Sequence, residues 1–334
     1  MQLIDNRSCS DPAINMALEE YLVRHYQGAA TVLLLYANEA AVVIGRNQVP
    51  YAEISLQEVV RRGIRVVRRL SGGGAVYHDQ GNLNFSLIQS HDPGALISPA
   101  EVLQPVVQGL NGMGLPVYLN ARHDIMADGK KVTGVAQYRT RGKCLTHGTL
   151  LVSADLEALR RTLAVDTDIP FSRGRLSVRS PVVNLCRYLP TLEMARVRER
   201  LIQSLAKRYG PAAPQALDPD AWDRVRAEAQ AKYRSWEWTM GRSPEFQLRR
   251  SADFVWGRCE AVMHIQRGIV NRIDMRLPED APARLNTLAA ALEGCRYHPA
   301  DVTAVLREVG REREDAVFVD HMAAWLGVTL CPWC

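Results

Sequence analysis

Three consecutive glycines (residues 72–74) follow a pair of arginines in the stretch RRLSGGGAVYH. Glycine triplets weaken helices and strands, because glycine loses the most backbone entropy on folding and has no side chain to pack. What they allow is a close approach to the backbone. Exposed N–H groups of such a turn bind anions, and Arg68 and Arg69 carry planar guanidinium groups that suit phosphate or carboxylate. The stretch therefore has the chemistry of an anion site.

Two familiar phosphate-binding motifs do not account for these glycines. A P-loop requires G-x-x-x-x-G-K-[ST] before a helix, and a dinucleotide site requires G-x-G-x-x-G before a helix. Here Leu83, Phe85 and Leu87 alternate with polar residues, which predicts a half-buried strand after the turn. The pattern is thus strand, glycine turn and strand. A hairpin corner with solvated arginines is equally compatible with these residues.

The flanking sequence predicts the elements that position this turn. Asp11 caps a helix that has Pro12 at its first position. Two apolar runs, TVLLLYA and AVVIG, predict buried strands around an exposed turn at residues 38–39. Hairpin signals at ADGKK and RTRGK join three later strands, and Ser153 is expected to cap the helix that follows them. Residues 190–233 are predicted to be mostly helical.

A change of composition near GRSPEFQLRR (residues 241–250) predicts a linker between two domains. Beyond it, the sequence predicts a hairpin that turns at residues 267–268 and three helical stretches. About eighty residues of this kind make a small α+β domain of plausible size for an appended module.

Composition excludes several classes of protein. In 334 residues, 47% are hydrophobic and 23% are charged, as in an ordinary globular protein. The net charge of +5 suits acidic ligands or an acidic partner but is too small to indicate nucleic-acid binding. No secretory signal or membrane-length apolar run is visible. Seven scattered cysteines indicate reduced thiols and a cytoplasmic protein, and the C-x-x-C of Cys331 and Cys334 is interpreted as incidental.

The extended stretch RRLSGGGAVYHDQGNLNFS resembles the signature of lipoate–protein ligases, in the biotin and lipoate ligase superfamily. Five further segments resemble family segments in family order: INMALEEYL, VVIGRNQVPYAE, DGKKVTGVAQY, THGTLLVSADLEAL and SVRSPVVNL. SWEW and the hairpin after residue 250 resemble the large bacterial ligases with a C-terminal accessory domain. One departure is NQVPYAE, where the family commonly has Asn-Pro-Trp, which puts a detail of packing or of the substrate pocket in doubt.

The resemblance implies an α+β fold: a catalytic domain (residues 1–245) with a mixed β-sheet flanked by helices, and a small α+β C-terminal domain (residues 250–334). It also implies a two-step reaction. ATP and lipoic acid form lipoyl-AMP with loss of pyrophosphate, and the acyl group then passes to a lysine of a lipoyl domain. The implied partners are 2-oxoacid dehydrogenase complexes or the glycine-cleavage H protein, with neither nucleic acid nor membrane involved.

Family binding residues carry over onto matching positions of this chain. The nucleotide and acyl contacts implied in this way are Arg69, Gly72, Gly73, Gly74, Ala75, Val76, Tyr77 and Lys131. Lys131 is the candidate catalytic residue, because adenylation brings two anions together and needs fixed positive charge at the α-phosphate. Lys130 is expected to be exposed in the turn. Asp124, where the family commonly has aspartate, is the candidate ligand for the Mg²⁺ that accompanies the triphosphate, although a surface turn aspartate is nearly as compatible.

Two other functions remain alternatives. An octanoyl- or lipoyl-transferase on the same fold would hold the acyl group on a cysteine. No cysteine precedes Asp124 in YLNARHDIM, and Cys144 is expected to be a buried core thiol. A nucleic-acid-binding protein would use the arginines of residues 61–69, but the sequence begins directly in catalytic-domain segments, which leaves no room for a DNA-binding module ahead of them. Both alternatives are less compatible with the motifs than a ligase.

Overall fold

The computed structural model of the chain describes residues 1–92, 95–310 and 316–327. The chain divides into two compact units. The first contains Met1–Arg46, Val67–Arg160 and Ser177–Arg234, and the second contains Asn47–Val66, Arg161–Leu176 and Ser235–Cys334. Two segments from within the expected catalytic domain thus group with the C-terminal part. The expected boundary between residues 245 and 250 stays a prediction.

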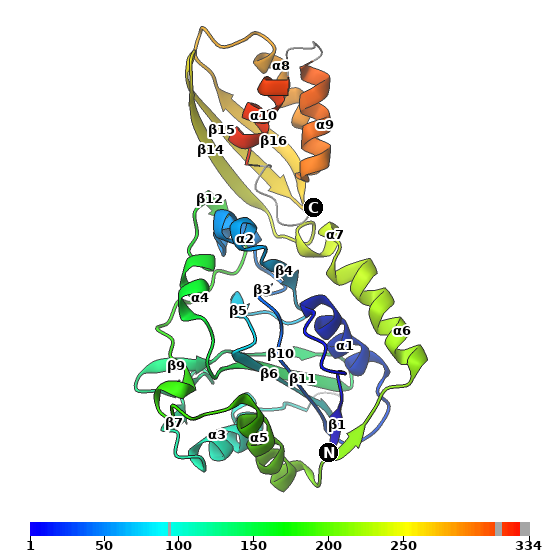
Figure 1. Ribbon diagram of the computed structural model, residues 1–334. Helices are drawn as coiled ribbons and strands as arrows, with labels where there is room; N and C mark the ends of the chain where they lie inside the picture. The colour runs from blue at the N-terminus through cyan, green and yellow to red at the C-terminus, as the bar shows by residue number, and fades with distance from the viewer. Residues whose placement is uncertain (93–94, 311–315, 328–334) are drawn as a thin grey trace. The chain divides into compact units, whose positions relative to one another are not determined.

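A six-stranded mixed sheet lies at the centre of the first unit (Figure 1). Its strand order is β10-β11-β6-β2-β1-β13. Strand β1 runs parallel to β2 and β13, whereas the other neighbours are antiparallel. The bounds are β1 (Gln2–Ile4), β2 (Val32–Tyr36), β6 (Asn82–Ser90), β10 (Val135–Arg139), β11 (Lys143–Leu151) and β13 (Ala213–Gln215). The expected mixed sheet of an α+β fold is confirmed.

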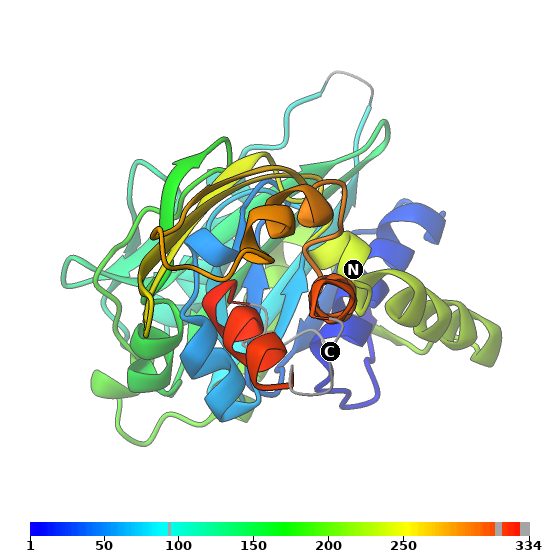
Figure 2. The same ribbon diagram turned by 90° about the horizontal axis from the view of Figure 1, so that it is seen from above.

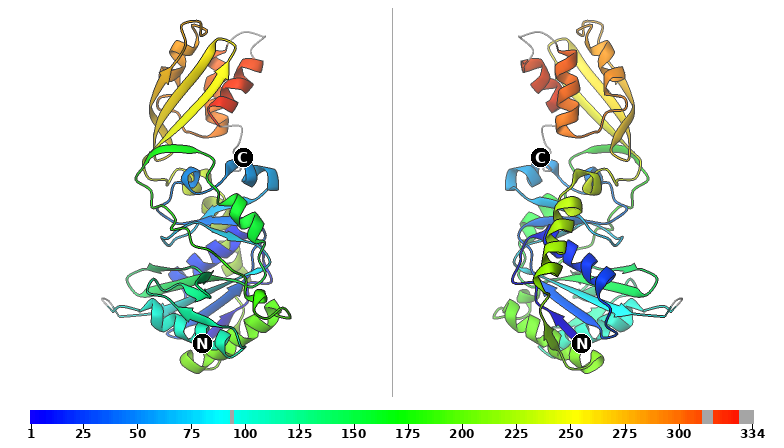
Figure 3. Two further views of the ribbon diagram at one scale, coloured as in Figure 1. Left: turned by 90° about the vertical axis from the view of Figure 1, so that its left-hand side faces the viewer. Right: turned by 90° about the vertical axis from the view of Figure 1, so that its right-hand side faces the viewer.

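Helices cover both faces of this sheet (Figures 1 and 3). On one face, α3 (Pro99–Asn111) and α5 (Met194–Tyr209) pack on the leucines and phenylalanine of β6, which belong to one hydrophobic core cluster with them. On the other face lies α1 (Pro12–His25), whose N-terminus is capped by the Asp11 side chain as expected. The first unit is therefore a sheet between two helical layers, and the large hydrophobic core lies on its α3 and α5 face.

Two smaller sheets in the first unit carry the sequence motifs. One has the order β4-β3-β5, and the glycines lie between β4 and β5, which confirms the pattern of strand, glycine turn and strand. The other has the order β7-β8-β9. The bounds of these strands are β3 (Ala41–Ile44), β4 (Arg65–Arg68), β5 (Val76–His78), β7 (Val117–Leu119), β8 (Ile125–Ala127) and β9 (Lys130–Thr133). The remaining helical segments are α4 (Leu156–Thr162), a 3₁₀ turn (Leu185–Arg187), α6 (Pro219–Glu228) and a π-helical turn (Ala229–Tyr233).

The second unit is built on an antiparallel sheet of order β12-β14-β15-β16, with helices α8, α9 and α10 on one face (Figures 1 and 2). The expected hairpin turns at Arg267 and Gly268, which have φ of 52° and 74°. The bounds are η1 (Pro50–Ala52), α2 (Leu56–Arg62), β12 (Asp168–Ser172), α7 (Trp236–Thr239), β14 (Phe246–Phe254), β15 (Gly257–Gln266), β16 (Ile269–Arg276), α8 (Leu285–Leu292), α9 (Pro299–Val309) and α10 (Ala316–Trp325). Cys331 and Cys334 lie outside the described residues.

Three local predictions are wrong. The turn after β2 is not exposed at Asn38, which is fully buried and hydrogen-bonded to Asn15 and His78. Strand β6 is not half-buried, because α1 covers its polar face as well. The cap of α4 is Asp155, whose side chain accepts from the second and third following N–H groups, rather than Ser153. Asn38 and β6 are buried by contacts with residues distant in the sequence, and the cap of α4 lies two residues after the predicted one.

The strand expected between the turns at ADGKK and RTRGK is divided at Gly134. Residues before it form β9 and pair with β8, whereas residues after it form β10 and join the six-stranded sheet. A side chain at Gly148, opposite this break, would lie 2.9 Å from the carbonyl oxygen of Gly134. The lack of a side chain at Gly148 therefore allows the chain to leave the sheet of β9 at Gly134 and continue into the sheet of β10.

Among residues 1–92, 95–310 and 316–327, no helix has the length and apolar character needed to cross a membrane.

Candidate active site

Both arginines before the glycines are buried. Arg68 is 0% exposed, and its Nη1 donates to the carbonyl oxygens of Gly45 (3.0 Å) and Arg46 (2.9 Å). Arg69 is 6% exposed. The alternative interpretation of a surface hairpin corner with solvated arginines is therefore wrong. A buried guanidinium must be hydrogen-bonded or paired, because desolvating a charge is costly.

Arg69 meets this requirement by binding the glycine turn itself. Its Nη2 donates to the carbonyl oxygens of Gly72 (2.6 Å) and Gly74 (2.8 Å), and its Nη1 donates to that of Val43 (3.0 Å). Its Nε donates to Ser71 Oγ (3.0 Å). Burial lowers the pKa of Arg69 to about 10, while the negative charge of Glu19 opposes the shift. The side chain is thus a cation at neutral pH and holds the turn in shape.

The glycines are required by close approach of the backbone. A Cβ on Gly45 would lie 2.1 Å from the carbonyl oxygen of Gly73, a distance that no real Cβ contact shows. Gly73 has φ of +91°, and a Cβ there would lie 2.9 Å from Arg69 Nη2. By contrast, a Cβ on Gly72 would meet no heavy atom within 4 Å. The turn therefore packs tightly at Gly73 and has open space at Gly72.

The backbone after the turn contacts the segment that follows β12. The N–H of Ala75 donates to Ser177 Oγ at 2.9 Å. A Cβ on Gly74 would lie 2.8 Å from the same oxygen. Val76 and Tyr77 continue into β5, where Tyr77 is buried. The Ser177 hydroxyl oxygen thus accepts a hydrogen bond from one N–H group of the stretch that the family resemblance assigns to the nucleotide.

Lys131 lies in β9 with its ammonium group on Asp124. Nζ is 2.7 Å from Asp124 Oδ1, and that carboxylate is largely buried. The Lys131 backbone donates to the carbonyl of Pro181 (2.8 Å) and accepts from the N–H of Val183 (3.1 Å). Lys130 is the first residue of β9 rather than part of the turn, because the turn consists of residues 128–129. Two backbone hydrogen bonds and one ion pair therefore orient Lys131.

The fold brings Lys131 next to the end of the glycine turn. A Cβ on Gly134 would lie 3.3 Å from Lys131 Cε, 3.4 Å from its Nζ and 4.0 Å from Val76 Cγ1. A Cβ on Gly73 would lie 3.8 Å from the Cβ of Ala136, which follows Gly134 by two residues. An ammonium group and a turn with bare backbone thus share one region of the first unit. Such a region can bind a carboxylate and a phosphate side by side.

The described residues contain no group of three or more His, Cys, Asp or Glu side chains arranged to hold a metal ion. Asp124 is a single carboxylate and is already paired with Lys131. This donor set does not fit an ion held by the protein alone. It fits an oxygen-seeking ion such as Mg²⁺ that phosphate oxygens largely coordinate.

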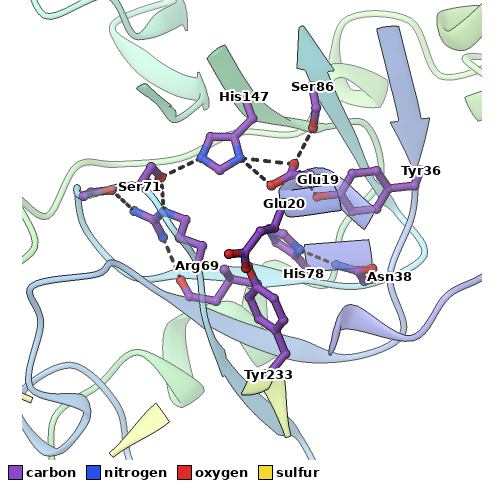
Figure 4. A network of polar contacts seen from close by, with 12 residues as sticks. Glu19, Glu20, Tyr36, Asn38, Arg69, Ser71, His78, Ser86, His147 and Tyr233 are labelled. Atoms are coloured by element: carbon purple, nitrogen blue, oxygen red, sulfur yellow. Dashed lines mark hydrogen bonds and ion pairs between the residues drawn. The ribbon is translucent and has the colours of Figure 1, made fainter. Parts of the chain in front are cut away.

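A buried polar network between α1 and the sheet borders the turn (Figure 4). Glu19 of α1, 2% exposed, contacts His147 of β11, and His147 contacts Ser71. Burial would raise the pKa of Glu19, but the neighbouring His147 and the hydrogen bonds that His147, Ser86 and Tyr36 donate outweigh it and lower the pKa. Sequence reasoning missed Glu19 and Ser71. An acidic residue on the buried side of the helix INMALEEYL was the available signal.

His78, at the end of β5, is buried in a second set of polar contacts. Its Nδ1 is 2.9 Å from Asn38 Nδ2, an amide group that can only donate, so Nδ1 is the acceptor. Burial, together with the neighbouring Arg69 and His147, lowers the pKa of His78 to about 3. The next residue, Asp79, accepts from the N–H of Gly81 at 2.8 Å and so holds the loop that follows β5.

We expect His78 to make the protein acid-sensitive. The unfolded state takes up a proton near pH 6.5, but the folded state does so only near pH 3, so stability is lost as pH falls through this window. The loss is about 1.4 kcal/mol per pH unit for one proton, or about 2 kcal/mol between pH 6 and pH 4.5. Urea unfolding at these two pH values measures it. His78→Gln should remove this part of the pH dependence, whereas His25→Gln, at an exposed site, should keep it. Equal pH dependence in wild type and His78→Gln would contradict the prediction.

Comparison with known proteins agrees with the motifs over most of the chain. Residues 11–206 match the family described as "Lipoyl protein ligase A/B catalytic domain", and residues 243–325 match "Bacterial lipoate protein ligase C-terminus". The lipoate-protein ligase LplJ of Bacillus subtilis is 36% identical over 271 residues, which cover 80% of this chain and 82% of the relative. Lipoate–protein ligase 1 of Staphylococcus aureus is 30% identical over 309 residues, which cover 92% and 94% of the two chains.

Solved structures are similar as well. A lipoate protein ligase from Thermoplasma acidophilum with bound lipoic acid has a TM-score of 0.61 and 28% identity, and covers 72% of this chain and 98% of its own. A study of the bi-partite ligase of that organism and its E2 lipoyl domain contains a chain with a TM-score of 0.62 and 29% identity, with 72% and 96% covered. A lipoate-protein ligase A bound with ATP has a TM-score of 0.60 and 28% identity, with 72% and 96% covered. With the two family matches and the curated relatives, these likenesses show that the chain belongs to the lipoate–protein ligases.

Proposed function

We propose that this chain joins lipoic acid to a specific lysine of an acceptor protein in two steps. In the first, a carboxylate oxygen of lipoate attacks the α-phosphorus of ATP, the bond to the β-phosphate breaks, and pyrophosphate leaves. In the second, the acceptor amine attacks the carbonyl carbon of lipoyl-AMP, the bond to AMP breaks, and the amine loses a proton. Relatives described with bound lipoic acid and with bound ATP support these two substrates.

The observation that carries the proposal is the placement of Lys131 beside the glycine turn. A Cβ on Gly134 would lie 3.4 Å from Lys131 Nζ and 4.0 Å from Val76 Cγ1. Lys131 bridges an acyl oxygen and an α-phosphate oxygen, which reduces the repulsion between the two anions as the bond forms. The backbone of residues 72–77 contacts the nucleotide, and the bare backbone at Gly72 leaves room for it.

Mg²⁺ enters this proposal as the ion of the triphosphate. Asp124 would supply one carboxylate oxygen, and phosphate oxygens would supply most of the others. When bound, the ion would supply positive charge to the departing pyrophosphate. Because Asp124 also orients Lys131 at 2.7 Å, its carboxylate serves both groups.

The acceptor of the second step is a lipoyl domain. The similar Thermoplasma acidophilum ligase is described together with its E2 lipoyl domain, which supports this partner class. Acyltransferase subunits of 2-oxoacid dehydrogenase complexes and the glycine-cleavage H protein are the two proposed carriers. A cytoplasmic location and the lack of nucleic-acid and membrane partners stay predictions.

Lipoate-dependent exchange of pyrophosphate into ATP by the purified protein tests the proposal. Exchange requires lipoate and ATP but no acceptor, because it reports the reversible first step alone. Adding a lipoyl domain should then consume lipoate and release AMP. Exchange that does not depend on lipoate would exclude the proposed first step.

Cys144 distinguishes this ligase from a transferase. The thiol is 0% exposed on β11, and its Sγ lies 4.0 Å from Thr146 Oγ1. We expect Cys144→Ala to keep ligase activity within about threefold, as for a modest core change. Cys259→Ala removes an equally buried thiol from the second unit and controls for the loss of packing. An acyl-Cys144 adduct in mass spectra, or ATP-independent transfer that Cys144→Ala abolishes, would favour the transferase.

A further inference from the structure

Four buried side chains connect helix α1 to the glycine turn in one chain of hydrogen bonds (Figure 4). Glu19 carboxylate oxygens lie 3.0 Å and 3.1 Å from His147 Nδ1. His147 Nε2 lies 2.6 Å from Ser71 Oγ, which lies 3.0 Å from Arg69 Nε. All four residues are less than 9% exposed. We name this set, Glu19, His147, Ser71 and Arg69, the buried relay.

The chemistry of the groups sets the direction of each hydrogen bond. Arg69 Nε can only donate, so Ser71 Oγ accepts from it. The Ser71 hydroxyl hydrogen then has two acceptors in reach, His147 Nε2 at 2.6 Å and the Gly72 carbonyl at 3.5 Å, and the shorter contact favours the imidazole. A carboxylate only accepts, so His147 Nδ1 carries a proton toward Glu19. Donation therefore runs without interruption from a cation to an anion.

The relay compensates the charge of Arg69 without direct contact. Arg69 has no carboxylate among its hydrogen-bond partners, which are Ser71 Oγ and three backbone carbonyls within the described residues. Ser71 and His147 carry the stabilising effect of Glu19 to it through aligned dipoles, which act strongly in a dry interior. The Gly72 and Gly74 carbonyls in turn depend on Arg69 for their position. The position of the glycine turn therefore depends on Glu19, a residue of α1 that lies outside the turn.

The same geometry resembles an acid, histidine and serine nucleophile, but the surroundings oppose that chemistry. Ser71 is 1% exposed, and its oxygen accepts from Arg69. A nucleophilic serine needs a free lone pair directed at the substrate and space for a tetrahedral carbon. The contacts of Ser71 indicate a structural role for the hydroxyl group.

We propose that Glu19, His147 and Ser71 are positioning residues for the first step: they keep the Arg69 guanidinium on the Gly72 and Gly74 carbonyls and so keep the backbone of the glycine turn in place for the nucleotide. This inference rests on the proposed function, because it assumes that the turn binds ATP. Loss of a relay member leaves Lys131 in place but loosens the turn. The effect therefore falls on nucleotide binding rather than on the chemical step.

Three variants test the buried relay. Ser71→Ala removes the central hydroxyl, and Glu19→Gln removes the charge at the far end while its amide oxygen still accepts from His147. Tyr36→Phe is the matched control, since the Tyr36 hydroxyl donates to the same carboxylate at 3.1 Å but lies outside the path to Arg69. Hydrogen exchange of the peptide covering residues 69–78 is measured without substrates, together with thermal stability. The KM for ATP and kcat are then measured by lipoate-dependent pyrophosphate exchange.

We expect Ser71→Ala and Glu19→Gln to speed exchange in residues 69–78 by about tenfold, and to raise the KM for ATP by about the same factor, as for loss of one charge-assisted hydrogen bond. The kcat should stay within about threefold. Tyr36→Phe should lower thermal stability but leave exchange of this peptide and the KM unchanged. If Ser71→Ala does not fold, Glu19→Gln decides alone, because it keeps the shape of the buried side chain.

Three results would overturn the relay: wild-type exchange in residues 69–78 of both relay variants, equal loosening in Tyr36→Phe, or an acyl group on Ser71 in mass spectra. A wild-type protein without lipoate-dependent activity would instead refute the proposed function. The hydrogen-exchange comparison needs no substrate, so it still decides whether Glu19 and Ser71 hold the turn.

Discussion

We expect Lys131→Ala to lower the rate of lipoyl-AMP formation by about a hundredfold or more, the usual cost of losing one preorganised group that stabilises transition-state charge. The ammonium group lies beside the glycine turn and is held by Asp124 at 2.7 Å, so no rearrangement is needed when the two anions meet. Because Lys131 acts on charge that develops during bond formation, kcat should fall more than the affinity for ATP. Lipoate-dependent pyrophosphate exchange measures both parameters.

Lys130→Ala is the matched control for this prediction. Lys130 is the neighbouring residue of β9, and successive side chains of a strand point to opposite faces, so its ammonium group does not share the Lys131 position. Its removal should change activity by less than about threefold. Thermal stability of both variants should be compared, because Lys131→Ala also leaves the Asp124 carboxylate without its cation. Equal losses at the two lysines, or none at Lys131, would assign the reacting phosphate to another part of the chain.

Gly73→Val should abolish ATP-dependent activity, with a loss of about a hundredfold or more. A β-branched residue at φ of +91° is strained, and its Cβ would lie 2.9 Å from Arg69 Nη2. The guanidinium group or the turn must move, and either movement displaces the backbone proposed to contact the nucleotide. Misplacement of such groups by about 1 Å can cost a hundredfold in rate.

Gly142→Val provides the comparison, since a Cβ at Gly142 would meet no heavy atom within 4 Å and its φ lies outside the left-handed region. Circular dichroism and thermal unfolding should show that both variants are folded. Full activity of a folded Gly73→Val protein would mean that the triplet is only a hairpin corner. Loss of activity in both variants would point to a general effect of valine rather than to the turn.

Local sequence determined the elements whose signals lie within a few residues. Asp11 and Pro12 predict the start of α1, because a capping oxygen and a fixed φ act on adjacent N–H groups. Residues 72–74 predict a turn because glycine adopts φ values that other residues avoid. The alternation of β6 predicts its two faces, because side chains of a strand alternate whatever covers them. The motifs around Lys131 and the glycines also predicted the family, which the comparisons confirm.

Tertiary structure alone decided what the polar groups do. The alternating polar residues of β6 read as a solvent-facing side, yet α1 covers them, and Ser86 becomes a partner of Glu19. Arg69 could be read as a solvated ligand for phosphate, but it is buried and hydrogen-bonded to the turn. The cause is physical: local pattern reports which residues share a face, whereas burial depends on the element that packs there. Glu19 and Ser71 are 52 residues apart in the chain, so only the packing of α1 against the sheet places them in one network.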